Sequence, residues 1–167
     1  VQEDPGNQEY KDALAKARQV SARSRYEKAR QAASAAAEPT VPVLERISKD
    51  ADAASKLDPS NKDIRSFSEG LKTKVATLQS RVKTLYGQAE TDLQKEDWAA
   101  ATAKLREVNK LYPGYEDAGN RLNKAEQEGA KILYQQGIAL GKQEDWKMAA
   151  SSRSEERRVG KECTIQC

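Results

Sequence analysis

Prolines recur in this chain at a fixed distance, since Pro5, Pro59 and Pro113 lie 54 residues apart. Two of them stand in related tetrapeptides, at residues 4–7 and 58–61, and the third is followed by Gly114. Proline cannot continue a helix, and glycine, serine and asparagine suit tight turns. The spacing therefore predicts a chain of repeated units that are separated by turns.

The unit after Pro59 has apolar residues at steps of three and four over about 30 positions, which is typical of one long amphipathic helix. We expect Ser60 or Asn61 to cap this helix. A break into two helices at Gly70 is the alternative. The apolar seam consists of Ile64, Phe67, Leu71, Val75, Leu78, Val82, Leu85, Ala89 and Leu93. It could dimerise as a coiled coil, but packing within its own hairpin is favoured because each hairpin must bury that face.

A second, shorter helix is predicted from Trp98 to Leu111, with Asp97 as its cap. The start of the same pattern returns at residues 145–149. The first unit shows the pair less clearly, with helical patterns over residues 10–36 and 43–57, and the third unit has a helical pattern over residues 118–140. Almost no strand is expected.

These residues resemble the tetratricopeptide repeat family. The resemblance is carried by Trp98, Ala101, Leu105, Leu111, Pro113, Gly137, Trp146 and Ala149. The ordinary unit of that family has 34 residues, whereas the units here have 54 or 48, with the excess in the first helix. The resemblance implies an all-α, right-handed solenoid of helical hairpins with long antiparallel helices. It also implies repeats like those found beside regulatory or sensory domains of large bacterial proteins.

Four segments are expected. Residues 4–57 form a degenerate hairpin repeat, 58–111 a repeat with a long first helix, 112–152 a truncated repeat, and 153–167 a non-native tail. The tail is set apart because residues 153–163 resemble the in-frame translation of a widely used sequencing-library adapter. Since the chain starts with Val1 in an ongoing repeat pattern, we expect an array that is incomplete at both ends.

Excluding the tail removes both cysteines, Cys163 and Cys167, and the chain has no histidine. Thiolate nucleophiles, disulfides and the usual zinc sites are then absent from residues 1–152. The alternative is a genuine tail that binds metal or becomes oxidised, on weak spacing evidence. No phosphate-binding glycine loop occurs, and the carboxylates are scattered. We therefore expect no enzyme activity and no cofactor.

Composition limits the partners that the chain can take. The formal net charge is +3, and apolar residues make up 37% of the chain without any run long enough to span a membrane. One basic cluster stands out, formed by Lys16, Arg18, Arg23, Arg25, Lys28 and Arg30. It could attract an anionic partner, but a solvated helix face is favoured, and we expect no nucleic acid. The compartment stays open, because a targeting signal could have been lost with a missing N-terminus, and the cytoplasm is favoured.

The function predicted from these observations is a protein interaction scaffold that docks a peptide or a partner domain in a groove lined by the first helices. Trp98 and Trp146 could face a ligand, but a packing role at the corner between two helices is favoured for both. The expected partner-binding residues are Arg65, Lys72, Lys83, Arg121, Lys124 and Gln135. The alternative is a structural spacer or a self-associating, coiled-coil-like stalk of a larger protein.

Overall fold

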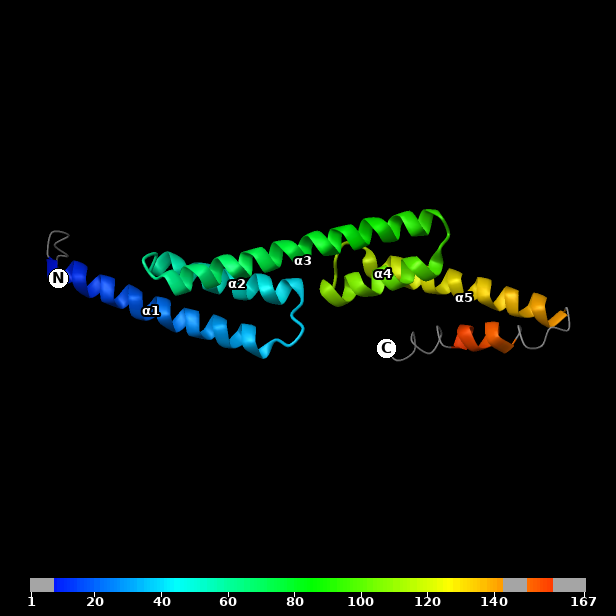
Figure 1. Cartoon of the computed structure of the whole chain (residues 1–167), viewed down its shortest axis with the longest axis horizontal. Helices are drawn as coiled ribbons and strands as arrows, with labels where there is room; N and C mark the ends of the chain where they lie inside the picture. The colour runs from blue at the N-terminus through cyan, green and yellow to red at the C-terminus, as the bar shows by residue number, and fades with distance from the viewer. Residues whose placement is uncertain (1–7, 143–149, 158–167) are drawn as a thin grey trace. The chain divides into compact units, whose positions relative to one another are not determined.

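The computed structural model describes residues 8–142 and 150–157. Five long helices follow one another within these ranges: α1 (Gln8–Ala35), α2 (Val41–Leu57), α3 (Lys62–Gln94), α4 (Trp98–Leu111) and α5 (Ala118–Lys142). Residues 150–157 are helical as well, and no strand occurs among the described residues. The chain reverses direction at each connection between successive long helices (Figure 1). The all-α fold with long, hairpin-packed helices is therefore confirmed.

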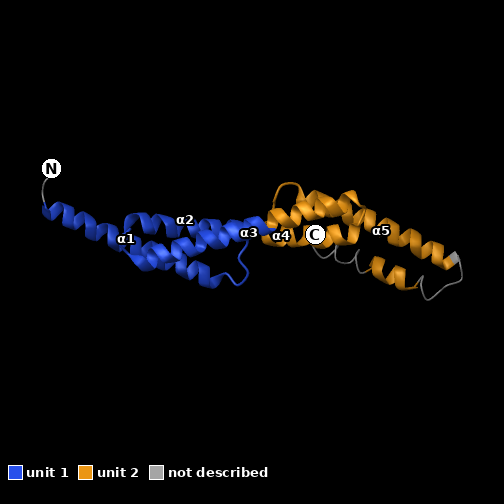
Figure 2. Ribbon diagram, turned by 45° about the horizontal axis from the view of Figure 1, so that its top comes forward, with its two compact units in different colours: residues 1–81 blue, residues 82–167 orange. Residues whose placement is uncertain are grey.

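The chain divides into two compact units, residues 1–81 and residues 82–167 (Figure 2). The first unit contains α1, α2 and the first part of α3, and the second contains the remainder of α3 with α4 and α5. The predicted repeat boundaries at 57/58 and 111/112 coincide with the ends of α2 and α4. They mark turns inside the units, and the division into repeats itself stays a prediction.

In the first unit, α1 and α2 approach closely through small residues. Ala22 and Ala29 of α1 are buried, as are Ala51 and Ala54 of α2. Alanine leaves little volume between two helix axes and is also the best helix former, so the same residues favour the helices and their contact. A proline in its first turn favours the start of α2, because an N–H group is not needed there.

The apolar seam predicted for the long helix is the face that α3 buries. Every one of its nine residues is buried or half-buried. In the first unit, Leu71 joins α1 and α2 in one buried cluster, and Ile64 joins them in another. Tyr26 and Phe67 meet edge to face, with ring centroids 5.3 Å apart. This part of the seam therefore packs against the preceding helix pair, α1 and α2, rather than within the predicted hairpin of α3 and α4.

The predicted helix starts are confirmed. The Asn61 side-chain oxygen accepts from the backbone N–H groups of Asp63 and Ile64, at 3.1 and 3.3 Å. The Asp97 carboxylate accepts from the Ala100 N–H at 3.1 Å. Both bonds satisfy donors that a helix N-terminus otherwise leaves open. α3 also continues through Gly70, so the alternative of a break at that glycine is wrong.

In the second unit, α4 packs along α5 through short apolar side chains. Ala101, Leu105 and Val108 of α4 are fully buried, as is Ala118 of α5, and Ala125 of α5 is 1% exposed. α4 ends at Leu111, two residues before Pro113. Gly114 then adopts a φ of 79°, a left-handed conformation that glycine takes without a steric penalty. This turn brings the start of α5 back beside α4.

Candidate binding groove

A polar network joins the last part of α3 to the start of α5. The Tyr86 hydroxyl donates to the Asp117 carboxylate. Arg121 donates from Nε to Asp117 Oδ1 at 2.8 Å, and its Nη1 pairs with Glu90 Oε1 at 2.9 Å. The guanidinium carbon lies 5.2 Å from the centre of the Tyr86 ring, within the range of a cation–π contact. Four side chains, two from α3, one from the turn before α5 and one from α5, thus hold one another in place.

The network separates the pKa values of its members. Burial, followed by the hydrogen bond to Asp117, raises the pKa of the Tyr86 hydroxyl. The bonds from Tyr86 and Arg121 lower the pKa of Asp117, and the bond to Asp117 raises that of Arg121. Tyr86 is therefore neutral at neutral pH, while Asp117 and Arg121 are charged. None of these shifts brings a pKa toward neutral pH, so the charges of the network do not change near that pH. We call these four side chains the clamp.

Beside this clamp lies a groove of about 500 Å³ between α3 and α5. We call it the α3/α5 groove. It is lined by Glu90, Leu93, Gln94, Trp98, Asp117, Asn120, Arg121 and Lys124. The side chains of Leu93 and Trp98 are half-buried and supply apolar surface, whereas Gln94, Asn120 and Lys124 are exposed. The groove thus combines an apolar wall with amide and ammonium donors.

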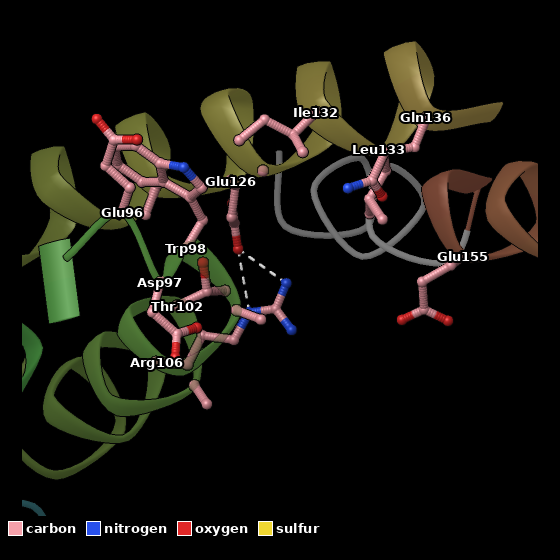
Figure 3. A pocket seen from close by; sticks show the side chains of 14 residues that line it. Glu96, Asp97, Trp98, Thr102, Arg106, Glu126, Ile132, Leu133, Gln136 and Glu155 are labelled. Atoms are coloured by element: carbon pink, nitrogen blue, oxygen red, sulfur yellow. Dashed lines mark hydrogen bonds and ion pairs between the residues drawn. The ribbon is translucent and has the colours of Figure 1, made fainter. Parts of the chain in front are cut away.

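A second pocket, of about 520 Å³, lies between α4 and α5 (Figure 3). Arg106 reaches across it from α4, and its Nη2 lies 2.8 Å from Oε1 of Glu126 on α5. Glu126 is only 8% exposed, so the charges largely neutralise each other in the wall of the pocket. Glu155 also lines it. That residue comes from the segment that resembles a translated adapter, so part of this lining belongs to the expected non-native tail.

Trp98 lies between the groove and the pocket and lines both. It is half-buried, and a Cβ atom built on Gly129 would lie 3.3 Å from the Trp98 Cβ, so the two helices come close at this point. The indole Nε1 is buried without a hydrogen-bond partner among the described residues. Trp98 is therefore half-buried at the start of α4 and lines both the groove and the pocket.

The residues predicted to bind a partner fall into both units. Arg65 and Lys72 belong to the first unit, where Lys72 pairs with Asp52. In the second unit the structure brings Arg121 and Lys124 together in the α3/α5 groove, whereas the exposed Lys83 and Gln135 are not among its lining residues. Arg121 is engaged in the clamp. Lys124 also lines the groove but does not belong to the clamp, so its ammonium group can pair with a ligand.

The repeat-signature residues are placed as follows. Ala101 and Leu105 are fully buried, Leu111 is half-buried, and Pro113 is exposed in the turn. Gly137 is buried, and a Cβ atom built on it would lie 3.5 Å from Cγ of Arg153. Trp146 and Ala149 lie outside the described residues.

Sequence reasoning missed Glu90, Leu93, Gln94, Asp117 and Asn120 as groove residues. Leu93 was assigned to the seam, and the others carry no motif. The proline turn at Pro113 predicts only that the next helix folds back, and it does not mark which residues of α5 lie beside the end of α3.

Among residues 8–142 and 150–157, no cluster of histidine, cysteine, aspartate and glutamate could hold a metal ion. Over the same residues, no helix is long and apolar enough to cross a membrane. No protein family, curated protein or solved structure matches the chain.

Proposed function

We propose that this chain is a protein interaction module that binds an extended peptide or a loop of a partner protein in the α3/α5 groove. One observation carries the proposal: an apolar wall of Leu93 and Trp98 stands beside three exposed donors, on a scaffold that an internal ion-pair network fixes. Sites that combine apolar surface with a few polar groups are typical of ligand binding, because the apolar contacts supply affinity and the polar groups set orientation. Peptides dock in grooves of the same kind. The resemblance to tetratricopeptide repeats supports the same class of function.

The chemistry of the groove defines the peptide that it favours. Glu90 and Asp117 are already paired with Arg121, which leaves the Lys124 ammonium as the charge available to a ligand. An acidic side chain would pair with it, and the amides of Gln94 and Asn120 would bind backbone groups. One apolar side chain would contact the wall formed by Leu93 and Trp98. We therefore propose a peptide with an acidic residue beside an apolar one.

The second candidate, a self-associating stalk, requires an apolar seam that is open to another copy. In the first unit the seam of α3 instead packs against α1 and α2, which favours the interaction module. Light scattering over a range of concentrations separates the two candidates. We expect a constant monomer mass, and a mass that rises with concentration would favour the stalk.

The groove is tested by selecting a displayed library of random peptides on the full chain. We expect enriched peptides to share an acidic residue beside an apolar one. Lys124→Glu should weaken their binding by about tenfold, since one favourable charge pair becomes a repulsive one. Lys74→Glu is the matched control, because it reverses one exposed charge of the first unit and should change little. Equal binding by both variants would contradict the assignment of the groove.

A further inference from the structure

One face of α1 carries a stripe of exposed side chains. Leu14, Ala17, Ser21, Ser24 and Lys28 follow one another at steps of three and four, so they lie on one face of the helix. All five are exposed, and Leu14 is 38% exposed. We call these five residues the α1 stripe. Leu14 and Ala17, at its N-terminal end, are apolar. Ser21 and Ser24 are small, and Lys28, at its C-terminal end, is cationic.

α1 is held in the first unit by a different face. Ala22 and Ala29 are its buried residues and pack into the clusters shared with α2 and α3. Every described residue from Gln8 to Ser21 is exposed. The helix is thus anchored through its second half, which leaves the α1 stripe outside the core of its own unit.

The charge of α1 is unbalanced. α1 contains seven lysines and arginines but only three carboxylates, whereas α2 contains three basic and three acidic residues. Arg18 and Arg25 flank the α1 stripe, and Lys28 belongs to it. None of these three forms an ion pair with a described residue. Because like charges repel, such a face is stabilised when carboxylates approach it.

A groove of about 340 Å³ lies between α1 and α2, at the C-terminal part of the stripe. Ser21, Ser24, Arg25 and Lys28 line it from α1, and Asp50 lines it from α2. The hydroxyl and cationic groups all donate hydrogen bonds, and serine side chains are short enough for another backbone to come close. The concave surface therefore offers donors where the charge is also positive.

We propose that the α1 stripe binds an acidic amphipathic helix of a partner protein. The apolar side chains of that helix would cover Leu14 and Ala17, and its carboxylates would pair with Arg18, Arg25 and Lys28. Helices dock in this way through side chains at steps of three and four. This surface lies in the first unit and rests on none of the residues of the α3/α5 groove.

A nucleic acid fits the same charges less well. Single-stranded binding uses aromatic rings as platforms for the bases, and the Tyr26 ring of α1 is instead packed against Phe67. The exposed Leu14 and Val20 would gain nothing from a phosphate backbone. The observations therefore favour a ligand with both carboxylates and apolar side chains.

The test uses a fluorescein-labelled synthetic peptide of 21 residues, with leucines at steps of three and four and glutamates beside them, titrated with the full chain. The variant R18E/R25E/K28E reverses the charges at the stripe. Its matched control K16E/R23E/R30E reverses three exposed charges on the opposite flank of α1. We expect the first variant to weaken binding at least about tenfold, and the control to weaken it by less than about threefold. Circular dichroism should show that both variants stay helical.

A second pair of variants tests the apolar part. Leu14→Ser should weaken binding of the peptide several-fold, whereas Val20→Ser, which changes an exposed apolar residue outside the stripe, should not. Three results would overturn the proposal: equal losses for the two charge-reversal variants, equal binding of a peptide with lysine in place of glutamate, or tighter binding of a 20-base-pair DNA duplex than of the peptide.

Discussion

The two units of this chain are built from similar helices but differ in how they use polar residues. The first unit, residues 1–81, has a core of alanine and aliphatic side chains, and the Lys72 side chain that pairs there with Asp52 is 56% exposed. The second unit, residues 82–167, adds a buried carboxylate, Glu126, and a hydroxyl network centred on Tyr86. Polar groups that satisfy one another fix a single geometry. The second unit therefore offers the more preorganised surface, which agrees with the peptide groove proposed there.

The largest expected effect is the loss of core volume in one unit. Leu105→Ala should destabilise the second unit by about 3 kcal/mol, because it leaves a cavity at a fully buried position. Ile47→Ala is the counterpart in the first unit, where Ile47 is 2% exposed. Amide hydrogen exchange reports each unit separately. Each variant should speed exchange mainly in its own unit, and equal acceleration in both units would contradict the division.

The next effect concerns ion pairs at different depths. Arg106→Ala should cost about 1–2 kcal/mol, since it takes the guanidinium from a buried carboxylate. Lys72→Ala should cost less than about 0.5 kcal/mol, because its side chain is 56% exposed and the pair is screened by solvent. Urea denaturation of the two variants measures the difference. A loss of equal size would remove the distinction between the units.

A smaller effect appears at alkaline pH. The pKa of Tyr86 is higher in the folded chain than the ordinary value of about 10, so the folded state keeps a proton that the unfolded state loses. The stability of the second unit is thus complete below pH 10 and falls as the pH rises above it. Tyr86→Phe should cost about 1 kcal/mol at neutral pH through the lost hydrogen bond. It should also make the alkaline loss shallower, as thermal unfolding across pH 8 to 11 can show. An unchanged slope would contradict the role of Tyr86.

The smallest expected effect is a gain. Gly70 and Gly87 lie inside α3, and a Cβ atom on either would meet nothing within 4 Å. Gly70→Ala should stabilise the first unit and Gly87→Ala the second, each by about 0.5–1 kcal/mol, because alanine is the better helix former. Melting temperatures of the single variants measure the gain. A decrease in either would mean that the position has a close neighbour.

Much of the fold could be predicted from the sequence because it depends on local patterns. The proline turns gave the ends of α2 and α4, and the apolar period gave the buried face of α3. The caps at Asn61 and Asp97 follow from bonds that reach only two or three residues along the chain. Such features need no knowledge of which helix lies beside which.

The candidate groove could be predicted only in part. Lys124 and Arg121 were expected on the helix surface, but Tyr86 and Asp117 are 31 residues apart and meet only after α4 has turned the chain back. No sequence period reports such a pair. The pairing of Lys72 with Asp52, 20 residues away, was missed for the same reason.

The most direct test of the proposed function is a two-dimensional NMR titration of the full chain with a peptide selected from the random library. We predict shift changes that cluster at the backbone amides of Gln94, Asn120 and Lys124. Thr102 and Gln136, which line the pocket between α4 and α5 instead, should change little. Changes that cluster at Thr102 and Gln136, or that spread along the whole of α3, would contradict the assignment of peptide binding to the α3/α5 groove.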